Sequence, residues 1–393
     1  MKKLYENTAL GDISSLDDAW DSKETFLFLP DRTDVSTEWI DTATEQFPDF
    51  LKTDHFALLT SGSTGLPKIV VGSKERSEKL TEVLHLLQDS EPIKQTVLSL
   101  PQSYCYAFVN QWLWSKKFNK ELVITPGFKQ AGLLKAALDK AEDAMLCLVG
   151  AQIPFFEQRF VNSSFPGIIR LHFAGGPFPQ NKIGTVRRLF PNAQIFNNYG
   201  CAEAMPRLTI RRLEESDKGA NIGKPLPGII MKSGADGEIL FTSPYGAVAF
   251  YDENGIRLVG ENEFIPSGDL GNEIEGGYWW IAGRSNQVFK RYGEKIALPR
   301  LLETVNLSWS GESAFYREKD PSGEEGHVLL LSPSPNPEQL REILQGFRKN
   351  HPRAHWPLRI ESIEKLPLLP NGKIDLAGLE GSTNRTTHWR QRI

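Results

Sequence analysis

Residues 60–68 read TSGSTGLPK, a run of hydroxyl-bearing residues and glycines that ends in a lysine. Hydroxyl groups donate hydrogen bonds to phosphate oxygens, glycines let backbone N–H groups approach closely, and a lysine offsets the negative charge. The run differs from the GxxxxGK[ST] loop, because Leu and Pro follow its last glycine and no Ser or Thr follows its lysine. Taken alone, it also fits a Ser/Gly-rich surface loop. The candidate phosphate ligands are Thr60, Ser61, Gly62, Ser63, Thr64, Gly65 and Lys68.

Several further runs carry residue types that a nucleotide enzyme needs. They include AGGP at 174–177, NNYGCAE at 197–203, SGDL at 267–270, GRSNQVFK at 283–290 and LPLLPNGKID at 366–375. In this order the runs resemble the adenylate-forming superfamily, which comprises acyl- and aryl-CoA ligases, peptide-synthetase adenylation domains and firefly luciferase. The resemblance covers residues 56–376 and implies activation of a carboxylic acid with ATP and Mg²⁺.

The resemblance implies a nucleotide site built from these runs. Tyr199 offers a flat apolar face to adenine, and Asp269, which follows a Gly turn, accepts hydrogen bonds from the ribose hydroxyls. The guanidinium of Arg284 suits contacts to ribose and phosphate, and Glu203 supplies a hard oxygen ligand for Mg²⁺. The implied nucleotide-site residues are Gly175, Gly176, Pro177, Asn198, Tyr199, Gly200, Ala202, Asp269, Arg284 and Lys290.

Lys373, in a Pro-Asn-Gly-Lys turn, is the leading candidate for catalysis. The family lysine at this place bridges the substrate carboxylate and the α-phosphate as charge develops there, whereas an isolated NGK sequence is an ordinary surface turn. Thr60 and Glu203 complete the expected catalytic set through contacts to phosphate and metal. The implied reaction is attack of the carboxylate on the α-phosphorus of ATP, which gives an acyl-adenylate and pyrophosphate.

A thiol then accepts the acyl group in this family, and the products are a thioester and AMP. The thiol belongs to CoA or to the phosphopantetheine arm of a carrier protein. We expect an acid-CoA ligase first, because the chain shows no appended carrier segment, and a carrier-protein ligase second. The resemblance implies rotation of the C-terminal domain about Asn286, so that Lys373 leaves and residues 291–297 admit the thiol. The candidates to meet CoA phosphates are Lys290, Arg291, Lys295 and Arg300.

The implied acid pocket is lined by Tyr104, Phe108, His172 and Gly176. Aromatic residues throughout 104–114 favour an aromatic or small apolar acid, but the same stretch is typical of a buried core helix. Arg207 and His172 are candidates to meet a second polar group on the acid.

Two of the departures from the family pattern bear on whether the chain is active. Ala202 stands where most members have a threonine that holds the α-phosphate, a loss of about 1 kcal/mol of hydrogen bonding. Only 59 residues precede Thr60, which indicates a reduced N-terminal subdomain. A non-catalytic adenylate-binding protein is therefore a further alternative, against which the intact Lys68, Glu203 and Lys373 argue.

The site requires a scaffold that alternates strands with helices. Apolar runs at 56–59, 96–100, 122–125, 144–149, 168–174 and 193–197 predict strands, and residues 73–89, 131–141 and 179–190 have helical spacing. This alternation predicts an α/β core with largely parallel strands. From residue 223 onward, short strands between Gly, Pro and Asp residues predict an antiparallel or barrel-like β subdomain.

The C-terminal hundred residues predict a small α+β domain, with helices at 298–305 and 337–350 and strands at 327–331 and 358–363. We therefore expect an ATP- and acid-binding domain at 1–284, shortened at its N-terminus, and a mobile lid domain at 285–393. Residues 1–55 predict mostly loops around one apolar run at 26–29, and residues 381–393 predict irregular structure.

Composition excludes several other classes of protein. A formal net charge of −4, from 49 acidic and 45 basic residues spread along the chain, disfavours a nucleic-acid or anionic-membrane partner. Cys105, Cys147 and Cys201 lack the spacing of a disulfide framework or zinc site. No apolar run is long enough to span a bilayer or to form the core of a signal peptide. We expect a cytoplasmic monomer or homodimer that binds a small carboxylic acid.

Overall fold

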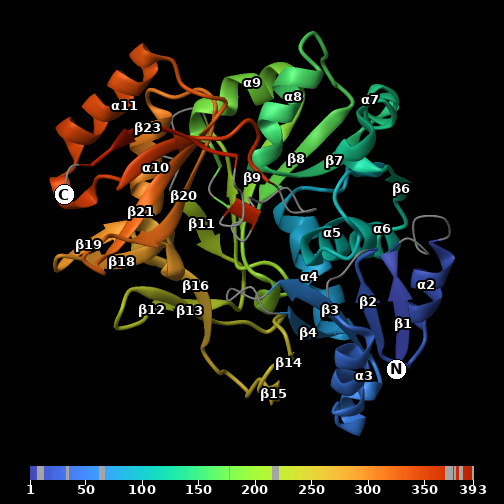
Figure 1. The fold of residues 1–393 in the computed structure, drawn as a ribbon. Helices are drawn as coiled ribbons and strands as arrows, with labels where there is room; N and C mark the ends of the chain where they lie inside the picture. Colours follow the sequence, from blue (N-terminus) through green and yellow to red (C-terminus); the bar gives the residue numbers. More distant parts are fainter. Residues whose placement is uncertain are drawn as a thin grey trace. The chain divides into compact units, whose positions relative to one another are not determined.

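A computed structural model describes residues 1–6, 13–31, 35–61, 67–176, 178–214, 221–367, 375, 378–379 and 384–391 of the chain (Figure 1). The chain divides into two compact units. The first unit comprises Met1–Ser267 and Asn272–Ile281, and the second comprises Gly268–Gly271 and Ala282–Ile393.

A six-stranded sheet opens the first unit. Its order is β1 (Lys2–Tyr5), β2 (Phe26–Leu29), β3 (His55–Ser61), β4 (Pro67–Ser73), β14 (Ala249–Asp252) and β15 (Gly255–Leu258). Strands β1, β2 and β3 are parallel, whereas β4 is antiparallel to both β3 and β14.

Helices cover both faces of this sheet at β2. Phe26 and Phe28 pack with Trp20 of α2 (Ser14–Asp21), and Leu27 and Leu29 pack in a separate cluster with α3 (Thr37–Glu45), as side-chain alternation along a strand requires. The expectation that residues 1–55 are mostly loops is therefore wrong. The short edge strand KKLY has no apolar alternation that would identify it in the sequence.

An eleven-stranded sheet forms the larger part of the first unit. Its order is β12 (Ile230–Ser233), β13 (Glu238–Thr242), β16 (Ile265–Ile274), β17 (Tyr278–Arg284), β11 (Asn221–Pro225), β10 (Thr209–Arg212), β9 (Gln194–Tyr199), β8 (Ile168–Ala174), β7 (Ala144–Val149), β5 (Gln95–Leu98) and β6 (Glu121–Ile124). The five strands from β9 to β6 are parallel, which confirms the predicted α/β core. Strands β11, β12, β13, β16 and β17 extend this sheet, and β14 and β15 join the six-stranded sheet, so the described strands of residues 221–284 do not form a barrel of their own.

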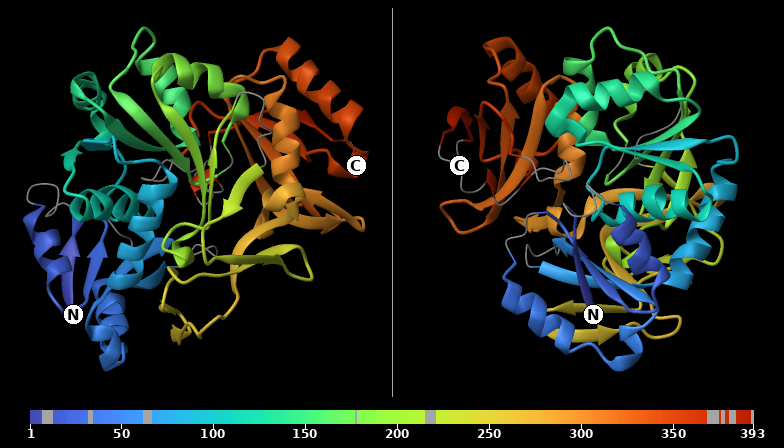
Figure 2. Two further views of the ribbon diagram at one scale, coloured as in Figure 1. Left: turned by 180° about the vertical axis from the view of Figure 1, so that it is seen from behind. Right: turned by 90° about the vertical axis from the view of Figure 1, so that its right-hand side faces the viewer.

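Helices sandwich the parallel strands (Figure 2). On one face, Leu146 and Leu148 of β7 pack with α7 (Ala131–Lys140), α8 (Ile153–Arg159) and α9 (Ile183–Leu189). On the other face, Cys147 and Val149 pack with Tyr106 of α5 (Cys105–Ala107). Helix α5 continues into the π-helix η2 (Phe108–Leu113) and α6 (Trp114–Lys117), beside α4 (Lys74–Leu87). The Ser73 side chain accepts a hydrogen bond from Arg76 N and so fixes the start of α4.

The second unit contains the predicted α+β elements. Its four-stranded sheet runs β20 (Glu312–Lys319), β21 (Glu325–Ser332), β22 (Arg359–Ser362) and β23 (Thr386–Arg390), and β18 (Val288–Arg291) pairs with β19 (Glu294–Ala297). Helices α10 (Leu298–Asn306) and α11 (Pro337–Asn350) pack on the sheet, and an Asn336 capping box begins α11. The expectation of irregular structure after residue 381 is wrong, because β23 pairs with β22 and places Trp389 against Trp356.

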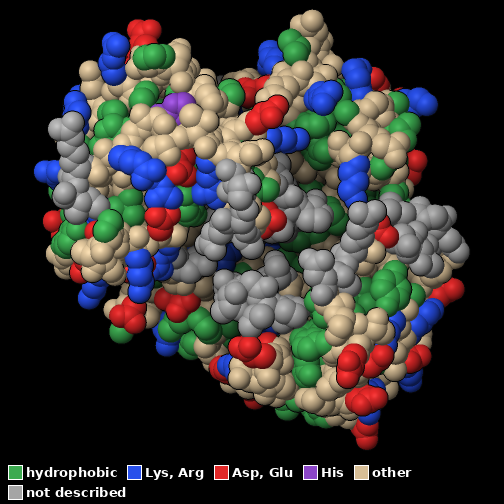
Figure 3. All heavy atoms as spheres, viewed as in Figure 1, with side chains coloured by type: hydrophobic (Ala, Val, Ile, Leu, Met, Phe, Trp, Pro, Cys, Tyr) green, Lys and Arg blue, Asp and Glu red, His purple; other side chains and the backbone are tan. Residues whose placement is uncertain are grey.

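Among the described residues, no helix is both long and apolar enough to cross a bilayer. On the face shown in Figure 3, acidic and basic side chains are interspersed and neither sign forms a continuous patch.

Candidate active site

The two ends of the phosphate loop are held by the β3–β4 hairpin. Thr60 pairs with Lys68 across the hairpin, and the Thr60 hydroxyl donates to the Lys68 carbonyl at 3.2 Å. The strand pairing therefore aligns Lys68 with the hydroxyl-bearing residues of β3. The predicted ligands Gly62, Ser63, Thr64 and Gly65 lie outside the described residues.

Lys68 meets Glu203, which lies 135 residues further along the chain. Lys68 Nζ donates to Glu203 Oε1 at 2.8 Å, each side chain is 22% exposed, and Nζ also lies 4.2 Å from the ring centroid of Phe250. Burial raises the pKa of Glu203, but the charge and hydrogen bond of Lys68 outweigh burial and hold this pKa below its ordinary value. Glu203 is therefore an ionised, partly exposed carboxylate at neutral pH.

The backbone around Glu203 is tightly packed. Glu203 lies in the 3₁₀ turn Ala202–Ala204 after β9, and its carbonyl accepts a hydrogen bond from Ala247 N at 2.9 Å. Gly200 has no space for a side chain, since a Cβ there would lie 2.0 Å from the Pro206 carbonyl oxygen. The motif glycine thus allows the chain to turn against residues 206–207 and brings Glu203 to Lys68.

The predicted adenine-side residues lie at the ends of β8 and β9. Tyr199 is 8% exposed and joins the hydrophobic core of the first unit. Gly175 has a positive φ of 82°, and a Cβ on Gly176 would have no heavy atom of a described residue within 4 Å. No described side chain or backbone segment therefore packs on Gly176 at this point. Pro177 lies outside the described residues.

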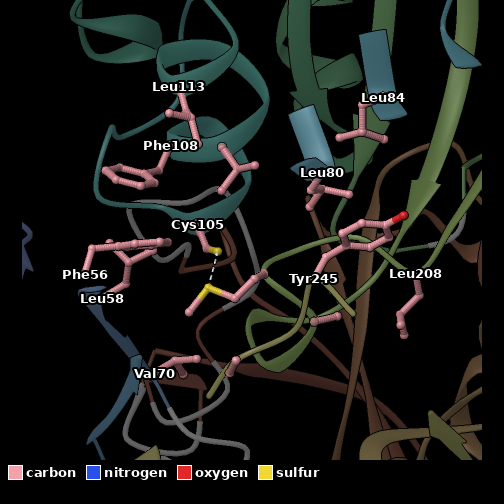
Figure 4. Close-up of a cluster of buried hydrophobic side chains, with 14 of the residues drawn as sticks. Phe56, Leu58, Val70, Leu80, Leu84, Cys105, Phe108, Leu113, Leu208 and Tyr245 are labelled. Atoms are coloured by element: carbon pink, nitrogen blue, oxygen red, sulfur yellow. Dashed lines mark hydrogen bonds between the residues drawn. The ribbon is translucent and has the colours of Figure 1, made fainter. Parts of the chain in front are cut away.

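The predicted pocket residues differ in their surroundings. Tyr104 is partly exposed, and its ring centroid lies 6.2 Å from that of Tyr106. Phe108 is completely buried and stacks on Phe56 at 5.0 Å, so its ring belongs to the hydrophobic core (Figure 4). His172 is buried in the face of β8 that packs on α5. The place of Phe108 in an acid pocket remains a prediction.

Cys105 lies within the same core. In Figure 4 its thiol points toward the sulfur of Met205, and the two sulfur atoms are 3.9 Å apart. Burial raises the pKa of the Cys105 thiol far above its usual range, so this cysteine is a packing residue and no nucleophile at neutral pH.

Three predicted nucleotide-site residues belong to the second unit. Asp269 is almost fully buried and accepts a charged hydrogen bond from Arg284 Nε at 2.9 Å. Gly268 supplies the positive φ of 77° that turns the chain before Asp269. Lys290 is exposed on β18, opposite Lys295 of β19. Lys373 lies outside the described residues.

Sequence reasoning missed two residues that the structure places beside the predicted ones. Phe250 covers Lys68, and Asn110 accepts a hydrogen bond from Arg207. Asn110 has a signal in the sequence, because it and Gln111 interrupt the apolar run at 107–114 with polar side chains. Phe250 has none, since only the pairing of β14 with β4 brings it to Lys68.

A sequence model of the AMP-binding enzyme family matches residues 8–242, which is more than half of the chain. The D-alanine–D-alanyl carrier protein ligase of Streptococcus pneumoniae (strain 70585) is 26% identical over 376 residues, covering 84% of this chain and 71% of the relative. The 2-succinylbenzoate–CoA ligase of Oceanobacillus iheyensis is 24% identical over 329 residues, covering 80% and 67%.

A solved structure shares the fold of the chain. It is O-succinylbenzoate coenzyme A synthetase from Bacillus subtilis in complex with ATP and magnesium ion, with a TM-score of 0.72, 16% identity and coverage of 96% of each chain. The likeness supports the predicted α/β architecture with a small α+β C-terminal part.

Proposed function

Because the chain belongs to the AMP-binding enzyme family, we propose that it activates a carboxylic acid with ATP as an acyl-adenylate and then transfers the acyl group to a thiol. The observation that carries this proposal is the contact between Lys68 and Glu203. It brings the cation of the phosphate loop and the predicted metal ligand to one place in the first unit.

The first step joins the acid to the α-phosphate. A carboxylate oxygen attacks the α-phosphorus, the bond from this phosphorus to the bridging oxygen breaks, and pyrophosphate leaves. Lys68 offsets negative charge on the phosphates, the Thr60 hydroxyl turns from the Lys68 carbonyl to donate a hydrogen bond to them, and Asp269 with Arg284 binds the ribose. Lys373 bridges the carboxylate and the α-phosphate, which positions the reacting atoms and stabilises the developing charge.

Mg²⁺ fits the residues present. Among the described residues no group of three or more His, Cys, Asp and Glu side chains is arranged to hold a metal, so a closed protein site is not available there. Glu203 is one ionised carboxylate, and Mg²⁺ binds well to one carboxylate together with phosphate oxygens and water. When bound, the ion neutralises phosphate charge and orients the leaving pyrophosphate.

The second step consumes the adenylate. The sulfur of a thiol attacks the acyl carbon, AMP leaves, and the thiol proton passes to solvent. We propose CoA as the first acceptor, supported by the CoA-ligase relative and by Lys290 and Lys295, which face each other across β18 and β19 and suit phosphate groups. A carrier-protein phosphopantetheine is the second candidate, because the Streptococcus relative is a carrier protein ligase.

An ATP–pyrophosphate exchange assay with a panel of aromatic and aliphatic acids tests the proposal. Exchange that depends on an acid supports it, and absence of exchange with every acid contradicts it. Supply of CoA or of a phosphopantetheinylated carrier protein then identifies the acceptor by thioester formation.

The role of Lys373 has its own test. We expect Lys373→Ala to reduce exchange by about 10²–10³-fold, as loss of one preorganised charge does, and to reduce thioester formation from supplied acyl-adenylate much less. Lys365→Ala, at an exposed lysine of the same segment, is the matched control. Equal losses in both half-reactions would contradict the assignment.

A further inference from the structure

A cluster of buried polar side chains lies between the parallel strands and α5 with η2. Its members are Tyr106 of α5, Asn110 of η2, His172 of β8, Asn198 of β9 and Arg207 just before β10. All five are less than a tenth exposed, and Arg207 and His172 are each 1% exposed. So many polar groups in a core position need a physical reason, because an unpaired polar group loses its hydration on burial.

Hydrogen bonds within the cluster leave several groups unused. Arg207 Nη2 donates to Asn110 Oδ1, and Asn198 Nδ2 lies 3.3 Å from both the Tyr106 hydroxyl and His172 Nδ1. Arg207 Nη1, His172 Nε2 and Asn198 Oδ1 have no hydrogen-bond partner among the described residues. The groups without a partner therefore come from β8, from β9 and from the segment before β10.

No acid among the described residues compensates the charge of Arg207. No described Asp or Glu forms an ion pair with it, and the titratable neighbours that favour its charged form are Tyr106 and Cys147. Both of these are neutral at pH 7, since burial raises the pKa of Tyr106 well above its usual range and that of Cys147 to about 12. Burial lowers the pKa of Arg207 only to about 10, so its guanidinium keeps its charge.

His172 contributes no negative charge to balance Arg207. Its pKa is held well below the usual range, first by burial and then by the charge of Arg207, so the imidazole is neutral at pH 7. Asn198 Nδ2 approaches Nδ1, which then acts as the acceptor, and the proton lies on the unpartnered Nε2. His172 and Arg207 thus each present an unused donor.

Another buried arginine of the same unit has a carboxylate partner. Arg170, two residues before His172 on β8, is 5% exposed, and it donates to Asp89 Oδ2 at 3.0 Å and to three backbone carbonyls. Within the part of the chain that the structure describes, Arg207 has one side-chain acceptor and no carboxylate. Burial of an arginine without an anion costs several kcal/mol of folding free energy. This cost is offset when an anion from outside the chain binds the guanidinium.

The cluster adjoins the predicted acid pocket. A Cβ on Gly200 would lie 2.9 Å from the α-carbon of Arg207, so Arg207 packs directly against the motif that carries Tyr199 and Glu203. Tyr106 neighbours Tyr104, and His172 precedes the Gly175–Gly176 turn by three residues. The cluster therefore lies next to the motif beside which the carboxylate of the acid reacts in the proposed function.

We propose that Arg207 binds a second carboxylate on the acid that is activated, so that the substrate class of this enzyme is a dicarboxylic acid. This inference rests on the proposed function and deepens it. Arg207 Nη1 and His172 Nε2 donate to the second carboxylate. A monocarboxylic acid of the same skeleton has no second carboxylate, so it leaves the guanidinium of Arg207 without an anion.

Matched acids test this assignment in the exchange assay. We use benzoate against phthalate, isophthalate and terephthalate, and butanoate against succinate. A charged hydrogen bond contributes about 10- to 100-fold in binding, so we expect kcat/KM for one dicarboxylate to exceed that of its monocarboxylate by at least tenfold. A preference for the monocarboxylate in every pair overturns the proposal.

Substitution of the arginine then links the preference to Arg207. In Arg207→Met the ratio of dicarboxylate to monocarboxylate kcat/KM falls at least tenfold, mainly through KM, and in Arg207→Lys it falls less. Arg212→Met, which removes an exposed arginine from β10, keeps the wild-type ratio. An unchanged ratio in Arg207→Met, or in Arg207→Lys if the first variant does not fold, overturns the proposal.

A binding experiment separates failure of this inference from failure of the proposed function. If no acid supports exchange, the adenylation proposal fails, and the melting temperature is then measured with phthalate or succinate at millimolar concentration. A rise in wild type that is absent in Arg207→Met supports the anion site. The same rise in both proteins, or no rise in either, overturns it.

Discussion

Removal of the Glu203 carboxylate separates the structural and the catalytic role of the Lys68–Glu203 pair. Glu203→Gln keeps the shape of the side chain but removes the charge that holds Lys68 Nζ at 2.8 Å. Both side chains are 22% exposed, so the loss of folding stability lies between that of exposed and buried pairs, at about 1–3 kcal/mol. If Glu203 also holds Mg²⁺, the variant loses roughly 3–4 kcal/mol of transition-state stabilisation, or 10²–10³-fold in rate.

Lys68 gives this variant a second signature. In the wild type, Glu203 neutralises Lys68, so the variant leaves the lysine free to meet phosphate. We expect metal-free ATP to bind the variant at least as tightly as the wild type, whereas the Mg²⁺ concentration needed for half-maximal exchange rises at least tenfold. Isothermal titration calorimetry measures the first quantity, and exchange rates over a magnesium series measure the second.

A matched pair elsewhere in the first unit supplies the control. Lys182 Nζ contacts Glu157 at 2.9 Å, with side chains 29% and 28% exposed, so the two pairs are similar in distance and exposure. Glu157→Gln is expected to lose a similar amount of stability and no exchange activity. If Glu203→Gln kept a third or more of the wild-type exchange rate with an unchanged magnesium dependence, the assignment of Glu203 as metal ligand would be refuted.

Three further predictions concern packing, ribose binding and acid stability. Gly200→Ala is expected to lose more than about 3 kcal/mol of stability in chemical denaturation, because its Cβ meets the Pro206 carbonyl. Gly176→Ala is expected to melt within a few degrees of wild type. Similar melting temperatures for the two variants would refute the packing argument. Asp269→Asn is expected to reduce kcat/KM for ATP by about 10- to 100-fold, and an unchanged value would exclude its contact with ribose. Burial lowers the pKa of His327 from 6.5 to about 3, so between these pH values the unfolded chain binds a proton that the folded chain does not. The free energy of unfolding therefore falls from pH 6.5 toward pH 3, by about 1.4 kcal/mol per pH unit. Chemical denaturation of His327→Leu should show a weaker fall over this range, and an equal fall would contradict the assignment to His327.

The sequence predicts the elements whose signals are local. Helix α11 carries its own cap, Asn336, and an amphipathic pattern, and its predicted and observed bounds agree. Strand β7 is a continuous apolar run, as expected of a strand buried on both faces. The sequence does not predict β1 and β23, because each is a short edge strand whose polar residues become a strand only through a partner.

The same distinction applies to the candidate site. The motifs identify Lys68 and Glu203 as members of one nucleotide site, but only the folded chain shows that they contact each other. Arg207 is one arginine among many in the sequence, and the absence of a carboxylate partner among the described residues becomes visible only in three dimensions. Long-range pairing decides both features, and no local pattern encodes them.

The transfer of an oxygen atom tests the central claim most directly. An acid labelled with ¹⁸O in both carboxylate oxygens is incubated with the enzyme, ATP, Mg²⁺ and an acceptor thiol, and the nucleotide product is analysed by mass spectrometry. Attack of the carboxylate on the α-phosphorus predicts AMP that carries one ¹⁸O atom, because the oxygen that bridges carbon and phosphorus leaves with AMP. Unlabelled AMP, or ADP with labelled inorganic phosphate, would contradict the account.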